Sequence, residues 1–201
     1  MKKQIISRYE TTQNNEVIID ASVRSVEDLY NNFDRTADYS KKDLDQEFVD
    51  YVTDCVREIG KRAFVIRISL STMPDKAIMD RIRRSVRTYF LYLQETERRQ
   101  LRAMLRRSLV LFMIGLALLV PAIAATRRFS SSEGVLAEVL AQGLTVAAWV
   151  SLWEAIANLF IEWFPHRENI KRYDHVTNAP VMFRQLPEDQ RGVENAAAPK
   201  S

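Results

Sequence analysis

The first half of the chain shows short strand-like and helix-like patterns of apolar and polar residues. Residues 16–23 alternate between apolar and polar side chains, and residues 63–70 form a compact apolar run; both patterns predict β-strands. Residues 40–60 repeat apolar side chains every three or four positions, which predicts an amphipathic helix. A second helical pattern runs over residues 74–107. This order of elements predicts a small α/β sandwich with one face of the sheet covered by helices.

The ends of the first predicted helix carry their own signals. Ser40 with Asp43 resembles a capping box that would open the helix, and Gly60 is expected to end it. Cys55 lies on the apolar face between them, so we expect a buried structural thiol and not a nucleophile.

Two strongly apolar segments follow. Residues 108–126 are free of charge over about 28 Å of helix, which is long enough to cross the hydrocarbon core of a bilayer. Residues 135–164 are longer and less purely apolar, and a short polar turn separates them from the first segment. A transmembrane hairpin is the simplest interpretation, while the core helix of a soluble protein is the alternative for the first segment. The predicted fold class is α+β and helix-rich, with a small cytosolic α/β sandwich on a two-helix transmembrane hairpin.

This pattern divides the chain into four expected parts. Residues 1–107 form a cytosolic α/β domain with a basic stalk helix, and residues 108–164 form the hairpin. Residues 165–186 return to the cytosol, where residues 181–183 could add a strand to the sheet or pack under it. Residues 187–201 are polar and small, which is typical of a disordered tail.

Basic residues predict the orientation of the hairpin. Eight of them flank the two segments on one side, against Arg127 and Arg128 in the connecting turn, so the positive-inside rule places both termini in the cytoplasm. The first ten residues lack an apolar stretch, and we expect no cleaved signal peptide. Four arginines are the expected contacts with anionic lipid headgroups: Arg102, Arg106, Arg107 and Arg167.

The second apolar segment has two distinct faces. Small residues recur every four positions and predict a helix-packing face, for a homo-oligomer or a membrane protein partner: Gly143, Ala147, Ser151 and Ala155. The polar residues Glu154 and Asn158 fall in the same sector, and Trp149, Ile156 and Phe160 fall on the opposite, lipid-facing one. Glu154 either pairs with Arg106, Arg107 or Arg167 at the membrane boundary or lines an ion path in an oligomer.

Composition removes most catalytic classes. The net charge is +3, and the five glycines form no phosphate-binding motif. One cysteine and two histidines leave no disulfide and little material for a metal or catalytic centre, so no catalytic, cofactor or metal residue is identified. Two groups of residues could supply metal ligands, but both are disfavoured: Glu162 with His166 and His175, and the loop acids Asp34, Asp38, Asp43 and Asp45. The nine arginines of residues 81–107 are explained by the membrane surface, which disfavours a nucleic-acid partner.

The second apolar segment and its exit resemble the signature of an uncharacterised family of bacterial two-span inner-membrane proteins. The matching positions are Gln142, Gly143, Leu144, Trp149, Val150, Trp153, Trp163, Pro165 and Arg167, with Asp43, Leu44 and Asp45 at the expected helix start. The chain departs from the family pattern at Glu154 and Ala155, where an Arg-Pro pair is expected. The resemblance implies a bacterial inner-membrane location and no activity.

These observations favour a non-enzymatic component of the membrane that oligomerises or binds a partner, as a sensor, a scaffold or a pore. A membrane-tethered enzyme or nucleotide-responsive effector is the alternative from another class, and an enzyme is the less favoured reading because no convergent polar site can be assembled. An accessory subunit of a larger membrane complex is the third possibility.

Overall fold

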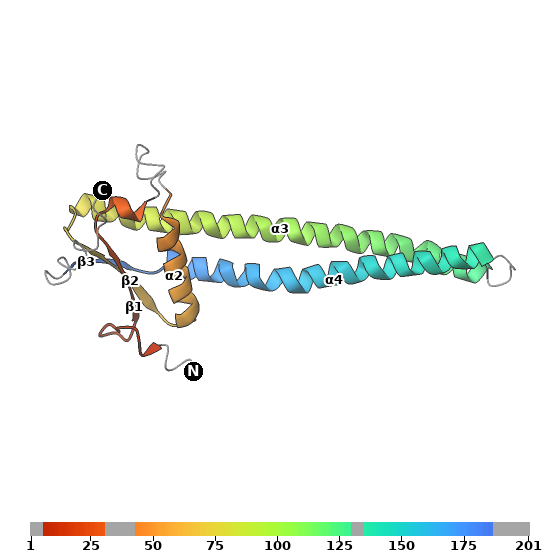
Figure 1. Cartoon of the computed structure of the whole chain (residues 1–201), viewed down its shortest axis with the longest axis horizontal. Helices are drawn as coiled ribbons and strands as arrows, with labels where there is room; N and C mark the ends of the chain where they lie inside the picture. Colours follow the sequence, from red (N-terminus) through yellow and green to blue (C-terminus); the bar gives the residue numbers. More distant parts are fainter. Residues whose placement is uncertain (1–5, 31–42, 130–134, 187–201) are drawn as a thin grey trace, which may run out of the picture. The chain divides into compact units, whose positions relative to one another are not determined.

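The computed structural model describes residues 6–30, 43–129 and 135–186. It contains three strands, a short 3-10 helix over Glu27–Leu29 and three long helices (Figure 1). The strands are β1 (Val17–Val23), β2 (Phe64–Leu70) and β3 (Val181–Gln185), and the helices are α2 (Gln46–Ile59), α3 (Lys76–Phe129) and α4 (Val135–Thr177). The two predicted strands and the two predicted amphipathic helices are confirmed, and the protein is a mixed, helix-rich α/β structure.

The helix α2 begins later than its sequence pattern suggested. Its N-cap is Asp45, whose side chain accepts hydrogen bonds from the main-chain amides of Glu47 and Phe48. A capping box of Ser40 with Asp43 is therefore wrong for this helix, and Ser40 lies outside the described residues. Gly60 ends α2 as expected, with a φ of 74° that other residues rarely adopt.

The three strands form one parallel sheet in the order β1–β2–β3. Helix α2 connects β1 to β2, while α3 and α4 together lie between β2 and β3 in the chain. The register pairs Ile66 with Val181 and Leu70 with Gln185. Of the two possibilities for residues 181–183, the structure shows the added strand.

The hydrophobic core lies on one face of this sheet. Alternate residues of β1 and β2 point into it, and they pack with α2, with the first turns of α3 and with the last turns of α4. Cys55 of α2 is buried there, as predicted. Helix α3 contributes Ile82, Val86 and Phe90, and α4 contributes Val176. Segments from both ends of the chain therefore share a single core.

The opposite face of the sheet carries a polar cluster. Asp20 of β1 stands beside Arg67 of β2 in the register, and Ser69 lies two residues further along β2. The third strand is held at its start by a side chain of α3, because the Arg83 guanidinium donates from Nε to the main-chain oxygen of Val181 at 3.1 Å. The same guanidinium lies 5.2 Å from the centre of the Phe183 ring.

The chain divides into two compact units, and the divisions fall inside the long helices. One unit is built from both ends of the chain, up to Gln94 and from Lys171 onward, and the other extends from Glu95 to Ile170. The helix predicted to end at residue 164 instead continues through Pro165 to Thr177. A proline inside a helix removes an amide donor, and its ring crowds the carbonyl four residues before it, which kinks a helix but does not always end it, as in membrane-spanning helices.

Candidate functional site

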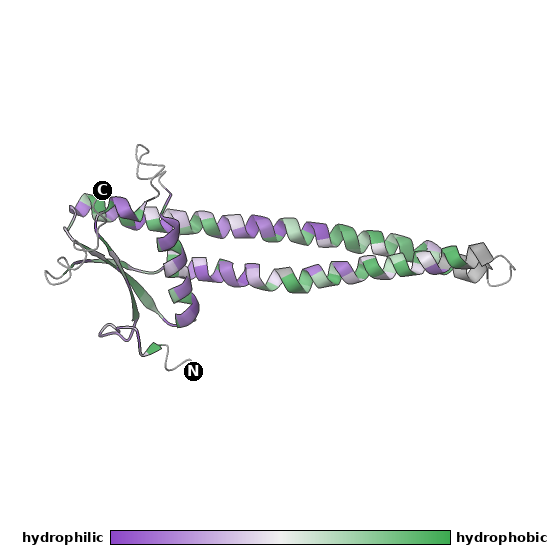
Figure 2. Ribbon diagram, in the orientation of Figure 1, coloured by the Kyte–Doolittle hydropathy of each residue, from purple (hydrophilic) through white to green (hydrophobic). Residues whose placement is uncertain are grey.

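The apolar segments of α3 and α4 are the first candidate functional feature. Both helices are long and apolar enough to cross a membrane, as Figure 2 shows by their hydropathy. In their most apolar windows only 17% and 11% of the residues are buried within the protein. A core helix of a soluble protein would bury most of such a window. The exposed apolar residues include those predicted to face lipid, Trp149, Ile156 and Phe160.

The two helices pack against each other in opposite directions within their own unit. Between residues 101 and 122 the buried and half-buried residues of α3 recur mostly every three or four positions, the spacing of coiled-coil contacts: Leu101, Met104, Ser108, Leu111, Gly115, Leu118, Leu119 and Ala122. At Gly115 the two helices come close together, because a Cβ added there would lie 2.8 Å from Cγ of Leu152. Ala148 and Ala155 of α4 are buried as well. Small residues therefore set the spacing of this pair.

The small-residue face predicted on α4 is divided by this packing. Ala155 is buried, whereas Gly143 and Ala147 are exposed. A Cβ added at Gly143 would meet nothing within 4 Å among the described residues. The Ser151 hydroxyl donates to the main-chain oxygen of Ala147, within the same helix. The role of this face in packing against another protein stays a prediction.

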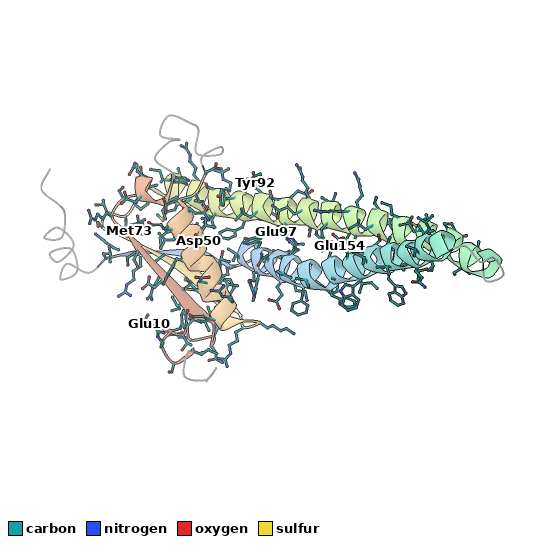
Figure 3. All side chains as sticks on the ribbon, turned by 45° about the vertical axis from the view of Figure 1, so that its right-hand side comes forward. Glu10, Asp50, Met73, Tyr92, Glu97 and Glu154 are labelled. Carbon is teal, nitrogen blue, oxygen red and sulfur yellow. The ribbon has the colours of Figure 1, made fainter. Side chains whose placement is uncertain are left out.

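Glu154 and Asn158 lie on α4 inside the apolar region. The Glu154 side chain is exposed (Figure 3), and within the described residues it makes no hydrogen bond or ion pair with Arg106, Arg107 or Arg167. Asn158 is half-buried. Neither the pairing nor the ion path predicted for Glu154 is tested by this arrangement.

The predicted headgroup arginines have different surroundings. Arg102 lies 3.4 Å from the carboxylate of Glu95, while Arg106 and Arg107 are exposed. Arg167 lies over the ring of Trp163, with 4.9 Å between its guanidinium carbon and the ring centre. Arginine on tryptophan is a favourable cation–π contact, and both residue types are common near lipid headgroups.

A charged groove in the other unit is the second candidate feature. Its volume is about 460 Å³, and it lies where the segment before β1 and helix α2 meet the polar side of the sheet. The sequence patterns did not indicate it. The lining residues are Arg8, Tyr9, Glu10, Ile18, Asp20, Tyr51, Asp54, Cys55, Glu58 and Arg67.

Ion pairs and hydrogen bonds already occupy most of the groove's polar groups. Arg67 contacts Asp20 at 2.6 Å and Glu10 at 2.8 Å, and the Ser69 hydroxyl donates to Asp20 at 2.9 Å. The Tyr9 hydroxyl donates to Glu58 at 2.6 Å. The groove is therefore a structural network that joins β1, β2, α2 and the N-terminal segment.

The same contacts change the ionisation of the network. Burial opposes ionisation of Asp20, but hydrogen bonds from Arg67 and Ser69 outweigh it, so the pKa of this carboxyl is lowered. Hydrogen bonds to Asp20 and Glu10 raise the pKa of Arg67 against the opposing effect of burial. Burial raises the pKa of Tyr51 to about 12, and it raises that of Tyr9 further, with help from Glu58. Both tyrosines stay neutral at physiological pH.

The two histidines considered above as metal ligands have different contacts. His166 contacts Glu97 of α3, whereas the His175 ring packs edge-on against Phe64, with 4.8 Å between ring centres. In the described ranges no three histidine, cysteine or acidic side chains gather as a metal site would require. Asp34 and Asp38 lie outside those ranges, and Asp45 serves as the helix cap.

Comparison of the chain with protein-family models, with characterised proteins and with solved structures finds no match. The resemblance to a two-span bacterial family stays a prediction from the residues quoted above.

Proposed function

We propose that the chain is an integral membrane protein with two spans, whose flanking segments form one domain on the cytoplasmic side. It acts there as an oligomeric or partner-binding component, in a sensing, scaffolding or pore-forming role. The observation that carries this proposal is the pairing of β3 with β2. Strand β2 precedes both apolar helices in the chain and β3 follows both, yet they lie side by side in one sheet.

This pairing restricts the possible topologies. A sheet cannot form across a bilayer, so the segments before α3 and after α4 must lie on the same side of the membrane. Either both apolar helices cross, or neither does. The exposure of the apolar residues and their length favour two crossings.

The basic residues support a specific orientation in the membrane. Arg106 and Arg107 precede the apolar part of α3, and Arg167 and Lys171 follow that of α4. Lysine and arginine accumulate on the cytoplasmic side of bacterial spans, which supports a cytoplasmic domain and an inner-membrane location. The anionic inner leaflet is the proposed partner of these side chains.

Accessibility of introduced cysteines tests the topology. In a Cys55→Ala background, single cysteines replace Asn14, Asn178 and Ser131, which lie before, after and between the apolar helices. In sealed spheroplasts a membrane-impermeant maleimide should label only the cysteine at position 131. Those at 14 and 178 should react only after permeabilisation. Labelling of positions 14 and 178 from opposite sides, or of all three from one side, contradicts the proposal.

The oligomeric or partner-binding role needs its own test. Native mass spectrometry of the chain extracted from its host in mild detergent should show several copies or a stoichiometric partner. A partner protein present at fixed ratio supports an accessory subunit, and a single copy with no partner contradicts the proposed role. The enzyme alternative gains no support from the described residues, where most of the groove's polar groups are engaged with one another and only Nε of Arg67 is a buried donor without a partner.

A further inference from the structure

A half-buried polar contact joins α3 and α4 away from their most apolar parts. Nδ1 of His166 lies 2.5 Å from Oε2 of Glu97, which is labelled in Figure 3, and Nδ2 of Asn169 donates to Oε1 of the same carboxylate at 3.2 Å. The Glu97 side chain is 16% exposed and that of His166 is 26% exposed. Neither the predicted topology nor the lipid contacts make use of this cluster.

The distance between the two groups requires a proton. A deprotonated Nδ1 facing a carboxylate oxygen at 2.5 Å would oppose two lone pairs, so one proton lies between them. The Asn169 amide donates to the second oxygen of the same carboxylate. An ionised carboxylate only accepts, so with Glu97 ionised the proton of this contact belongs to Nδ1. The protonation of the other ring nitrogen then decides whether His166 is charged.

The charged groups on the neighbouring turns have other surroundings. On α3, Glu95 contacts Arg99 and Arg102, and Arg98 is exposed. On α4, Arg167 lies over Trp163, and Glu168 and Lys171 are exposed, while Glu162 stands one turn before His166 in the sequence. The His166 ring itself contacts Glu97 of α3.

We infer that the Glu97–His166 contact makes the pairing of α3 and α4 depend on pH. With both ring nitrogens protonated, an imidazolium and a carboxylate attract each other in a poorly hydrated position. Loss of one proton leaves a neutral ring and removes the charge attraction, so the helices are held less firmly at this level. Histidine is the side chain whose charge ordinarily changes between pH 5 and 8.

Distances between spin labels test this inference directly. Labels at Gln100 of α3 and Phe164 of α4, both exposed, report the helix separation in a Cys55→Ala background. The protein is used full-length in lipid nanodiscs at pH 5.5 and at pH 8.5. The distance distribution should be narrow at the lower pH and broader, with a longer component, at the higher pH. Identical distributions at both values would overturn the inference.

Three variants locate the effect. His166→Gln keeps a hydrogen-bonding side chain without a titratable ring and should abolish the change with pH, and Glu97→Gln should do the same. The matched control is His175→Gln, which removes the second histidine of the chain and should retain the change. Retention in His166→Gln, or loss in His175→Gln alone, contradicts the inference. The spin-label distance reports the separation of the helices and not the side of the membrane on which the domain lies. The inference can therefore fail while the proposed topology holds, and the topology can fail while the inference holds.

Discussion

The main-chain amide of Leu186 donates a hydrogen bond of 2.9 Å to the carbonyl of Leu70. Leu70 ends the strand before the two apolar helices, and Leu186 follows the strand after them. The chain therefore closes its sheet only after both helices have been made. Residues up to Gln94 contain two strands, and the third depends on a segment at the far end of the chain. Completion of the sheet therefore depends on the part of the chain that follows the helix pair.

Shared packing between the two chain ends gives a stability prediction. Phe90 of α3 is fully buried, and its ring centre lies 6.0 Å from that of Tyr173 of α4. Phe90→Ala should lower the free energy of unfolding of the domain by about 3–5 kcal/mol, because it removes a buried ring and leaves a cavity. Urea unfolding followed by tyrosine and tryptophan fluorescence measures it. Tyr92→Ala, at an exposed position two residues away, should change stability by less than about 0.5 kcal/mol. Equal effects of the two variants would contradict the placement of this core.

Two glycines of the apolar helices should respond differently to a methyl group. Gly115→Ala places a Cβ 2.8 Å from Leu152 and should weaken the α3–α4 pair by about 1–3 kcal/mol through overpacking. Gly143→Ala meets open space and should be neutral, or stabilising by up to about 1 kcal/mol through helix propensity. Thermal unfolding in detergent compares them. Loss of oligomers in Gly143→Ala with normal thermal stability would show that the small-residue face contacts another protein. A loss of stability in Gly143→Ala as large as in Gly115→Ala would contradict the packing.

The polar face of the sheet predicts an acid-sensitive contribution to stability. The pKa of Asp20 is lowered in the folded state, so its stabilising effect is present above the unfolded-state value of about 3.9 and is lost as pH falls through the folded value. Asp20→Asn should therefore be less stable than the wild type from pH 5 to 8. The difference should shrink below about pH 4. Chemical denaturation over a pH series measures it.

Glu10→Gln is the matched control for that series. Glu10 contacts the same Arg67, but its side chain is 68% exposed, and solvent screens such a pair. Its substitution should therefore cost less than that of Asp20. A stability difference for Asp20→Asn that persisted at pH 2 would show that packing, and not the charge, accounts for it.

The exposed arginines next to the apolar part of α3 predict a lipid preference. Arg106→Gln with Arg107→Gln should reduce the affinity for anionic lipid, by about 1 kcal/mol or roughly fivefold for each charge. Native mass spectrometry of lipids retained from mixed phosphatidylglycerol and phosphatidylethanolamine nanodiscs measures the change. Arg81→Gln with Arg87→Gln removes the same charge from the exposed surface of the other unit. Equal losses in both double variants would show that only net charge matters.

The strands and helices were largely predictable because their patterns are local. Alternation in β1, the apolar run of β2 and the helical repeat in α2 each follow from neighbours in the sequence, and the structure confirms them. The ends of the helices were harder to predict from the sequence. Ser40 with Asp43 and Asp45 are competing N-cap candidates within a few residues. The structure decides between them, because Leu44 pairs with Tyr30 and the helix begins directly after Asp45. Pro165 suggests the end of a helix in the sequence, whereas α4 continues through it to Thr177.

The side-chain clusters could not be predicted, because each depends on long-range register. Arg67 meets Asp20 only because β1 and β2 are parallel and aligned residue by residue. His166 meets Glu97 only because α3 and α4 run in opposite directions with Gly115 at Leu152. In the sequence, an isolated histidine and one acid among many arginines carry no such signal. The contacts within both clusters can be identified only after the fold is known.

The hydrogen bond from Arg83 to Val181 also limits how far the sheet can grow. A terminal strand normally offers its free amides and carbonyls to any extended chain that approaches, which is a route to aggregation. Here a guanidinium from α3 occupies one of those carbonyls at the start of β3 and brings a positive charge to the place where a fourth strand would begin. The helix that leads toward the apolar region thereby also protects the domain from unwanted strand addition.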